Sequence, residues 1–131
     1  MKEKMHSRVV AAVIMRGDKY LCMQRCRSNY SYISERWEFP GGKVEDGEDD
    51  RAALAREIKE EMDWTISVGR QLAAVDYSYP DFGVTVVAYL CECPEEDDFK
   101  LLEHLKYKWL RRDELDTLEW TAADAELIKQ L

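Results

Sequence analysis

Three glutamates near the middle of the chain have a spacing that suits a metal-binding helix. Residues 49–62 contain no proline or glycine and a single β-branched residue, so this segment is predicted to be an α-helix. At about 100° per residue, Glu57, Glu60 and Glu61 share one arc of about 100° on its surface. Carboxylates this close repel one another, and a divalent cation that prefers oxygen ligands would neutralise them. Taken alone, the same spacing also suits a solvated acidic helix face.

The residues around these glutamates extend the pattern. Residues 43–63 contain nine acidic and four basic side chains, so they carry five of the eight net negative charges of the chain. Five residues separate Gly42 from Glu48, and seven more precede the run Arg56-Glu57-Ile58-Lys59-Glu60-Glu61-Met62-Asp63-Trp64. This arrangement resembles the signature of the Nudix hydrolases: glycine, five residues, glutamate, seven residues, then Arg-Glu-apolar-x-Glu-Glu-x-Gly-apolar. Eight of the nine defined positions match.

Asp63 is the departure, because the family has glycine at this helix end. A left-handed backbone is common at such a position, and glycine adopts it freely whereas aspartate adopts it at some cost. We therefore expect Asp63 to affect local stability and not the metal site, and Asp63→Gly to be neutral or stabilising.

The resemblance to the MutT-like branch of this family covers nearly the full chain. It rests on the runs Trp37-Glu38-Phe39-Pro40-Gly41-Gly42-Lys43-Val44-Glu45, Tyr79-Pro80-Asp81 and Leu118-Glu119-Trp120-Thr121-Ala122-Ala123-Asp124. Within that branch the chain is most similar to CTP pyrophosphohydrolases and 8-oxo-dGTP diphosphatases. The resemblance implies a single domain over residues 1–131 with the Nudix fold, a mixed β-sheet sandwiched between helices.

The resemblance also implies a catalytic metal site. Its ligands for magnesium or manganese would be the carbonyl oxygen of Gly41 and the carboxylates of Glu57, Glu60, Glu61 and Glu103. Glu103 lies in a loop where relatives have a glutamate that binds the metal or acts as a base, although it could equally be one more exposed acid. Arg56 would steer the carboxylates, with Glu48 as its partner.

Four further residues are implied contacts of the substrate. Phe39 would offer a stacking face and Arg25 a cationic contact, and Tyr79 would flank the pocket. Asp124 would hydrogen-bond the base: an ionised carboxylate accepts from an amino group such as cytosine N4, whereas a protonated one donates, which suits an oxidised guanine. The alternatives are that Phe39 and Tyr79 are core residues, that Arg25 is a strand-edge charge, and that Asp124 only complements a helix dipole.

Periodicity and turn residues predict the elements that position these side chains. Strands at residues 8–15 and 20–25 form a hairpin around Gly17-Asp18. Other strands are predicted at residues 36–39, 65–78, 82–92 and 106–110. The run Pro40-Gly41-Gly42 is predicted to end the first of these strands, because it cannot continue a regular structure. A final helix is predicted over residues 121–131 with Thr121 as N-cap. Mixed strands with a central and a terminal helix indicate an α/β or α+β sandwich.

Composition narrows the possible partners. A net charge of −8 disfavours binding to nucleic-acid polymers, and no apolar run approaches the roughly 20 residues of a membrane span. Residues 9–15 are too short for a secretory signal. The cysteines lack zinc-site spacing, and we expect Cys22, Cys91 and Cys93 to be buried in strands and free of disulfides. We therefore expect a cytoplasmic protein, and the resemblance implies a small-molecule nucleotide as substrate, bound by a monomer or homodimer.

The implied reaction is hydrolysis of a nucleoside triphosphate to a monophosphate and pyrophosphate, with (d)CTP and 8-oxo-dGTP as leading substrates. Two alternatives stay open. One is hydrolysis of another diphosphate-linked compound such as ADP-ribose or a dinucleoside polyphosphate, which the short chain disfavours. The other is a nucleotide-binding module without turnover, which the full set of signature carboxylates disfavours.

Overall fold

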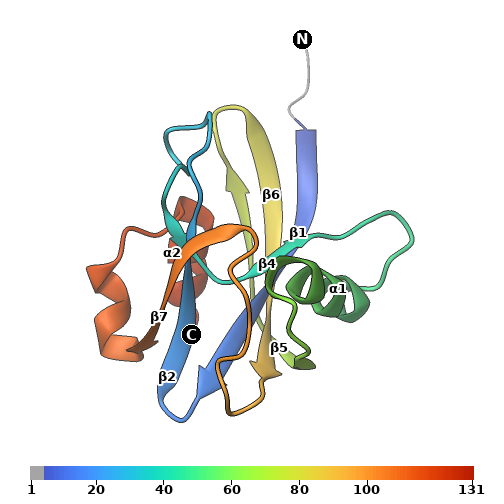
Figure 1. The fold of residues 1–131 in the computed structure, drawn as a ribbon. Helices are drawn as coiled ribbons and strands as arrows, with labels where there is room; N and C mark the ends of the chain where they lie inside the picture. The colour runs from blue at the N-terminus through green and yellow to red at the C-terminus, as the bar shows by residue number, and fades with distance from the viewer. Residues whose placement is uncertain (1–4) are drawn as a thin grey trace.

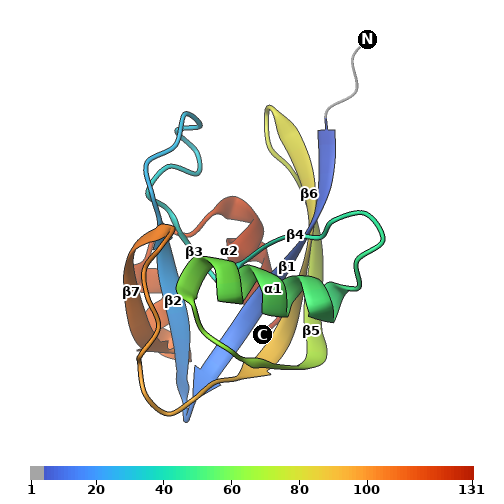
Figure 2. The same ribbon diagram turned by 45° about the vertical axis from the view of Figure 1, so that its right-hand side comes forward.

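Successive side chains of the first strand point to opposite faces of the sheet, and a different helix covers each face. The computed structural model describes residues 5–131. In β1 (Met5–Arg16), Val10, Ala12 and Ile14 pack in one core cluster with helix α1 (Asp50–Met62). The intervening Ala11 and Val13 pack in a second cluster with helix α2 (Ala122–Ile128). The two helices therefore lie on opposite sides of β1 (Figure 2), and the expected sandwich of a mixed sheet between helices is confirmed.

Within residues 5–131 the strands form one seven-stranded mixed sheet, whose arrangement can be followed in Figure 1. β1 runs parallel to β6 (Phe82–Glu92), which pairs antiparallel with β5 (Ser67–Ser78). The other edge of β1 is divided between β4 (Gly41–Lys43), which pairs with residues 9–11, and β2 (Lys19–Arg25), which pairs with residues 15–16. β2 in turn lies between β3 (Trp37–Glu38) and β7 (His104–Arg111). Figure 2 shows the β2–β3–β7 part diverging from the rest of the sheet above the β1–β2 hairpin.

Most of the predicted elements are confirmed. The hairpin at residues 8–15 and 20–25 is β1 and β2, and β1 begins earlier because its first residues pair with β6. The helix over residues 49–62 is α1, and its N-cap Asp49 accepts a hydrogen bond from the Ala52 amide (3.2 Å). The strands at residues 65–78, 82–92 and 106–110 are β5, β6 and β7.

Four details of the prediction are wrong. The strand at residues 36–39 covers only Trp37–Glu38. Pro40-Gly41-Gly42 does not stop the sheet, because Gly41–Lys43 pairs with β1 as β4. The final helix ends at Ile128 and not at Leu131, whereas the prediction of Thr121 as its N-cap is confirmed, although no side-chain capping hydrogen bond is present. A 3₁₀-helix, η1 (Arg112–Thr117), was not predicted.

The end of α1 behaves as its departure from the signature suggests. Asp63 adopts the left-handed conformation (φ 48°, ψ 45°), and its amide donates to the Lys59 carbonyl (3.0 Å). Its carboxylate pairs with the ammonium groups of Lys59 (2.9 Å) and Lys100 (3.2 Å) at the surface. The charged side chain therefore has partners that glycine would lack.

The burial of the cysteines agrees only in part with the expectation from the sequence. Cys22 and Cys91 are buried as expected, and burial raises the pKa of each thiol to about 12. Cys93 is only partly buried, so that expectation is wrong for this residue, and Cys26 is exposed.

Within residues 5–131, neither helix has the length and hydropathy needed to cross a bilayer.

Candidate active site

Arg56 organises the acidic side of helix α1. Its guanidinium donates to both carboxylate oxygens of Glu48 (2.7 and 2.9 Å) and to the Lys43 carbonyl (3.1 Å), so the expected pairing with Glu48 is confirmed. The same group donates to Glu57 (2.9 Å) and Glu60 (3.2 Å). The hydrogen bond from Arg56 lowers the pKa of Glu48 to about 2. Arg56 thus ties the loop before α1 to two of the three helix glutamates.

Two glycines let β4 lie directly against α1 and β1. A Cβ atom on Gly42 would stand 2.3 Å from the carboxyl carbon of Glu57, and one on Gly41 would stand 1.9 Å from the Val10 carbonyl oxygen. Any larger residue would push β4 away from one neighbour or the other. The glycine pair therefore sets how closely the β4 backbone approaches the helix carboxylates.

Glu61 is the buried member of the three glutamates. It is 7% exposed, and its Oε2 atom has no hydrogen-bond partner within residues 5–131. Burial, followed by the charges of Glu38, Glu57 and Glu103, raises the pKa of Glu61 to about 9, against the effect of a hydrogen bond from the Gly41 amide. A carboxyl group in this setting lacks a cationic partner.

Glu57, Glu60 and Glu103 differ in their surroundings. Burial is the largest cause of the raised pKa of Glu57, although Arg56 opposes it. Glu60 is 57% exposed and accepts a hydrogen bond from Arg56. The Glu103 carboxylate makes no hydrogen bond or ion pair with any residue that the structure describes, and its charge acts on both Glu57 and Glu61.

In the described part of the chain, these side chains do not form a closed metal-binding cluster. Across residues 5–131, no three carboxylate, imidazole or thiol groups already converge closely enough to hold an ion. The contacts explain this, since Arg56 draws Glu57 and Glu60 toward itself while Glu61 stays buried. The fit to a divalent cation is nevertheless good, because the unpartnered oxygen of Glu61 and three neighbouring negative charges would all gain from one. The Gly41 carbonyl lies on β4, beside the same helix.

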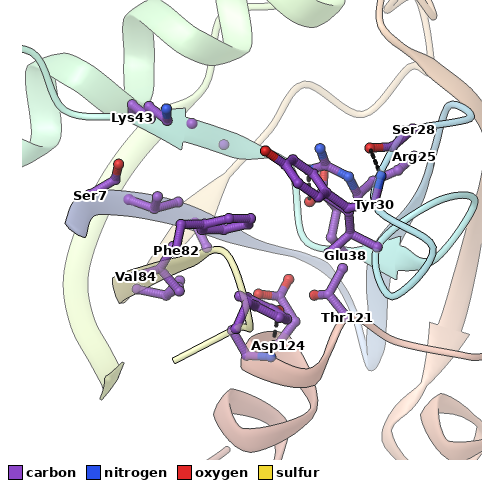
Figure 3. Close-up of a pocket in the computed structure, with 18 of the residues that line it drawn as sticks. Ser7, Arg25, Ser28, Tyr30, Glu38, Lys43, Phe82, Val84, Thr121 and Asp124 are labelled. Atoms are coloured by element: carbon purple, nitrogen blue, oxygen red, sulfur yellow. Dashed lines mark hydrogen bonds and ion pairs between the residues drawn. The ribbon is translucent and has the colours of Figure 1, made fainter. Parts of the chain in front are cut away.

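A cavity of about 790 Å³ connects this acidic side with α2. Glu61, Glu103 and Gly41 line it, and so do Arg25, Phe39, Tyr79 and Asp124, the four predicted substrate contacts. Figure 3 shows Asp124, from the first turn of α2, and Thr121, which precedes this helix, on the side of the cavity opposite Lys43 of β4. We call the side lined by Glu61 and Glu103, with Glu57 behind it on α1, the acidic end of the cavity, and the side lined by Phe39, Tyr79 and Asp124 the base end.

The base end is built on hydrogen bonds between distant segments. Asp124 Oδ2 accepts from the Phe39 amide (2.8 Å), and the Tyr79 hydroxyl accepts from the Ala123 amide (3.0 Å). Phe39 packs on Trp120 with ring centroids 5.0 Å apart. Phe39 and Tyr79 therefore belong to the core and also line the cavity. Burial, followed by the charge of Glu38, raises the pKa of Asp124 to about 8.

Glu38 and His104 join the two ends, and neither was predicted. Glu38 Oε1 accepts from Arg25 (2.9 Å), and Oε2 lies 3.0 Å from His104 Nε2. Burial opposes ionisation of Glu38, but the hydrogen bond with His104 and the charge of Arg25 outweigh it and lower its pKa. Arg25 is thus held by a carboxylate and is not a free cation. A charge between Trp37 and Phe39 in a short strand was the available sequence signal, whereas His104 gave none.

Two aromatic residues that line the cavity were also not predicted from the sequence. Tyr30, which is 41% exposed, and Phe82 line the cavity with ring centroids 5.5 Å apart (Figure 3). Tyr30 lies in a polar loop and Phe82 begins β6, so only the fold brings them together. They give the cavity an aromatic wall beyond the two buried rings.

Comparison with known proteins decides the family. The model of the NUDIX domain matches residues 5–131. The chain belongs to the Nudix hydrolase family. As a Nudix hydrolase it acts on phosphoanhydride bonds, and enzymes of this family generally use divalent metals.

The relatives of this Nudix hydrolase are MutT-like. A Mycobacterium tuberculosis protein named as a candidate 8-oxo-dGTP diphosphatase is 35% identical over 127 residues, which cover 94% of this chain and 86% of that protein. The Escherichia coli CTP pyrophosphohydrolase is 45% identical over 67 residues, 50% of this chain and 47% of that protein. The solution structure of the E. coli ORF135 protein matches with a TM-score of 0.80 at 29% identity, covering 97% of this chain and 89% of that one.

Proposed function

We propose that this Nudix hydrolase converts 8-oxo-dGTP and water to 8-oxo-dGMP and pyrophosphate, with Mg²⁺ or Mn²⁺ as cofactor. The observation that carries the choice of base is the buried Asp124, whose pKa of about 8 keeps it protonated at neutral pH. Its Oδ2 atom is engaged by the Phe39 amide, so its remaining oxygen can donate a proton to an acceptor on the base. Guanine and 8-oxoguanine present O6 as such an acceptor.

The acidic end supports the metal requirement. Glu57, Glu61 and Glu103, with the Gly41 carbonyl, would hold the cation beside the cavity, and Glu60 would join them on release from Arg56. The cation would neutralise the phosphates and make bound water more acidic. Arg56 donates hydrogen bonds to Glu57 and Glu60 and orients them, and the Gly41 amide orients Glu61. Metal and base would thus contact opposite parts of one nucleotide.

A second candidate substrate is (d)CTP, because of the similarity to the E. coli CTP pyrophosphohydrolase over half of the chain. Cytosine presents its N4 amino group as a donor, so it would pair best with an ionised Asp124. The raised pKa of Asp124 therefore favours the guanine over the cytosine compound near pH 7.

The test is a hydrolysis assay of purified protein with 8-oxo-dGTP, dGTP, dCTP and ADP-ribose, each with Mg²⁺, Mn²⁺ or EDTA. Products are separated by ion exchange. We expect 8-oxo-dGTP to have the highest kcat/KM, pyrophosphate as product, and no turnover in EDTA. Faster dCTP hydrolysis would contradict the role given to Asp124. Faster ADP-ribose hydrolysis, or binding without turnover, would overturn the proposed substrate class.

A further inference from the structure

His104 follows Glu103 directly and is buried where Glu103 is exposed. Its side chain is 3% exposed, and Nε2 lies 3.0 Å from Glu38 Oε2. Because Nε2 faces a carboxylate, it is the nitrogen that carries the proton and donates. Nδ1 is also buried and has no partner within residues 5–131. Glu38 is therefore the polar contact that fixes the orientation of this imidazole.

The hydrogen bond between His104 and Glu38 spans three strands. Glu38 lies on β3 opposite Met23 of β2, and His104 opens β7 opposite Arg25 of the same strand. The register of β2 with β7 shifts between Gln24 and Arg25, so regular strand pairing is interrupted where β7 begins. The contact from β3 to β7 thus fastens the first residue of β7 where the strand ladder is weakest.

The backbone around Glu103 is held from two more sides. The Leu102 amide donates to the Glu61 carbonyl (3.2 Å), and the Cys26 thiol donates to the Glu103 carbonyl (3.2 Å). The Glu103 carboxylate, in contrast, has no partner among the described residues, although it lies close enough to raise the pKa of Glu61. A fixed backbone with a free acidic side chain is the arrangement that a metal or water contact needs.

We propose that His104 is a positioning residue, whose hydrogen bond to Glu38 holds the start of β7 so that the Glu103 carboxylate faces Glu57 and Glu61. This inference rests on the proposed function of the acidic end, and assigns His104 no contact with substrate. Without the hydrogen bond, the first residues of β7 would be free to move away from α1 and carry Glu103 with them. The loss would fall on turnover more than on substrate affinity, because the base end is held by separate contacts.

Two substitutions of equal polarity separate the hydrogen bond from general packing. The amide nitrogen of His104→Gln can occupy the place of Nε2 and donate to Glu38, whereas that of His104→Asn is one methylene too short. We expect His104→Asn to lower kcat for the best substrate by about 10–100-fold, the usual cost of a lost supporting contact, with KM changed less than about threefold. His104→Gln should retain kcat within about threefold. Lys106→Ala, an exposed change on the same strand, is the control.

A double-mutant cycle then asks whether His104 acts through Glu103. If it does, Glu103→Gln and Glu103→Gln/His104→Asn have the same kcat, with melting temperatures measured alongside to exclude unfolding. Three results would each overturn the inference: a double variant whose loss of kcat is the product of the two single losses, a His104→Asn enzyme with unchanged kcat, or a Glu103→Gln enzyme with unchanged kcat. A wild-type protein without metal-dependent hydrolysis would remove the proposed function as well, whereas an active wild type with additive variants removes the inference alone.

Discussion

Glu61 at the acidic end and Asp124 at the base end are both buried carboxyl residues of one cavity, yet their partners differ. Glu61 accepts one hydrogen bond from the Gly41 amide, leaves Oε2 without a partner in the described chain, and faces three other carboxylates. Asp124 accepts from the Phe39 amide in apolar surroundings, with Arg25 nearby. The first environment gathers negative charges around an oxygen that has no hydrogen-bond partner among the described residues, and the second favours retention of a proton because it is buried.

The difference shows that a raised pKa has two functional meanings. At the acidic end, burial is the largest cause of the raised pKa of Glu61, the charges of three neighbouring carboxylates raise it further, and a divalent cation would reverse the shift. At the base end, burial dominates, and the resulting neutral carboxyl becomes a hydrogen-bond donor. We therefore expect the two residues to respond differently to substitution, pH and metal.

The largest expected effect is the loss of turnover in Glu61→Gln. Removing the charge of the buried ligand should lower kcat by about 10³-fold, because charge stabilisation at the reacting phosphate is lost. Steady-state hydrolysis at saturating Mg²⁺ measures this. The exposed change Glu95→Gln is the matched control and should leave kcat unchanged. An active Glu61→Gln enzyme would break the assignment of the acidic end.

At the base end, substitution should separate a donor from an acceptor. Asp124→Asn keeps an acceptor for the Phe39 amide and a donor for the base, so kcat/KM for 8-oxo-dGTP should stay within about threefold. Asp124→Ala leaves the base and the Phe39 amide without a partner and should lower kcat/KM by about 10–100-fold. Competition between 8-oxo-dGTP and dCTP in one reaction measures both. Equal losses in the two variants would mean that the carboxylate form is the one required.

The pH dependence should follow the protonation of Asp124. With a pKa raised from 3.8 to about 8, the carboxyl group is a donor below pH 8 and loses this proton above it. The ratio of kcat/KM for 8-oxo-dGTP to that for dCTP should fall as the pH rises through 8, by up to about tenfold per pH unit. Taking the ratio cancels titrations at the acidic end, and Asp124→Asn should show no such fall. A ratio that rises with pH would contradict the proposed donor.

Without metal, Glu61→Gln should make the protein more stable at alkaline pH. The pKa of Glu61 is raised from 4.5 to about 9 on folding, so its stabilising contribution is complete below pH 4.5 and is lost as the pH rises through 9. Between pH 5 and pH 8, the wild type should lose about 4 kcal/mol relative to the variant. Urea unfolding in EDTA measures the difference, and saturating Mg²⁺ should reverse it by stabilising only the wild type.

The smallest effect is expected from substitution of Asp63, whose carboxylate lies outside both ends of the cavity. Asp63→Gly relieves the left-handed backbone but removes the pairs with Lys59 and Lys100, which are exposed and therefore weak. The melting temperature should stay the same or rise by up to about 4 °C, with kcat unchanged. A clear fall in the melting temperature would show that the two lysine contacts outweigh the backbone strain.

The acidic end could be predicted from the sequence better than the base end, because its pattern is local. Glu57, Glu60 and Glu61 lie within five residues of one helix, and the pairing of Arg56 with Glu48 spans eight. Even there, the helical arc did not separate the exposed Glu60 from the buried Glu61. That distinction depends on β4, whose pairing with β1 is a tertiary contact that the glycines permit.

The base end depends on contacts that no local pattern records. The hydrogen bond between Phe39 and Asp124 joins residues 85 positions apart, and that between Glu38 and His104 joins residues 66 apart. The resemblance indicated Asp124 but left its protonation open, since burial by distant segments determines the pKa. Glu38 and His104 gain their roles only when β3 and β7 lie on either side of β2.

The most direct test of the contrast between the two ends is a ¹³C NMR titration of the side-chain carboxyl carbons, with and without Mg²⁺. In metal-free protein, Asp124 should titrate near pH 8 and Glu61 near pH 9. Mg²⁺ should move the Glu61 titration to acidic pH and leave that of Asp124 in place. An Asp124 already ionised at pH 6, or a Glu61 whose titration ignores Mg²⁺, would contradict the division of the cavity into a metal-binding end and a base-binding end.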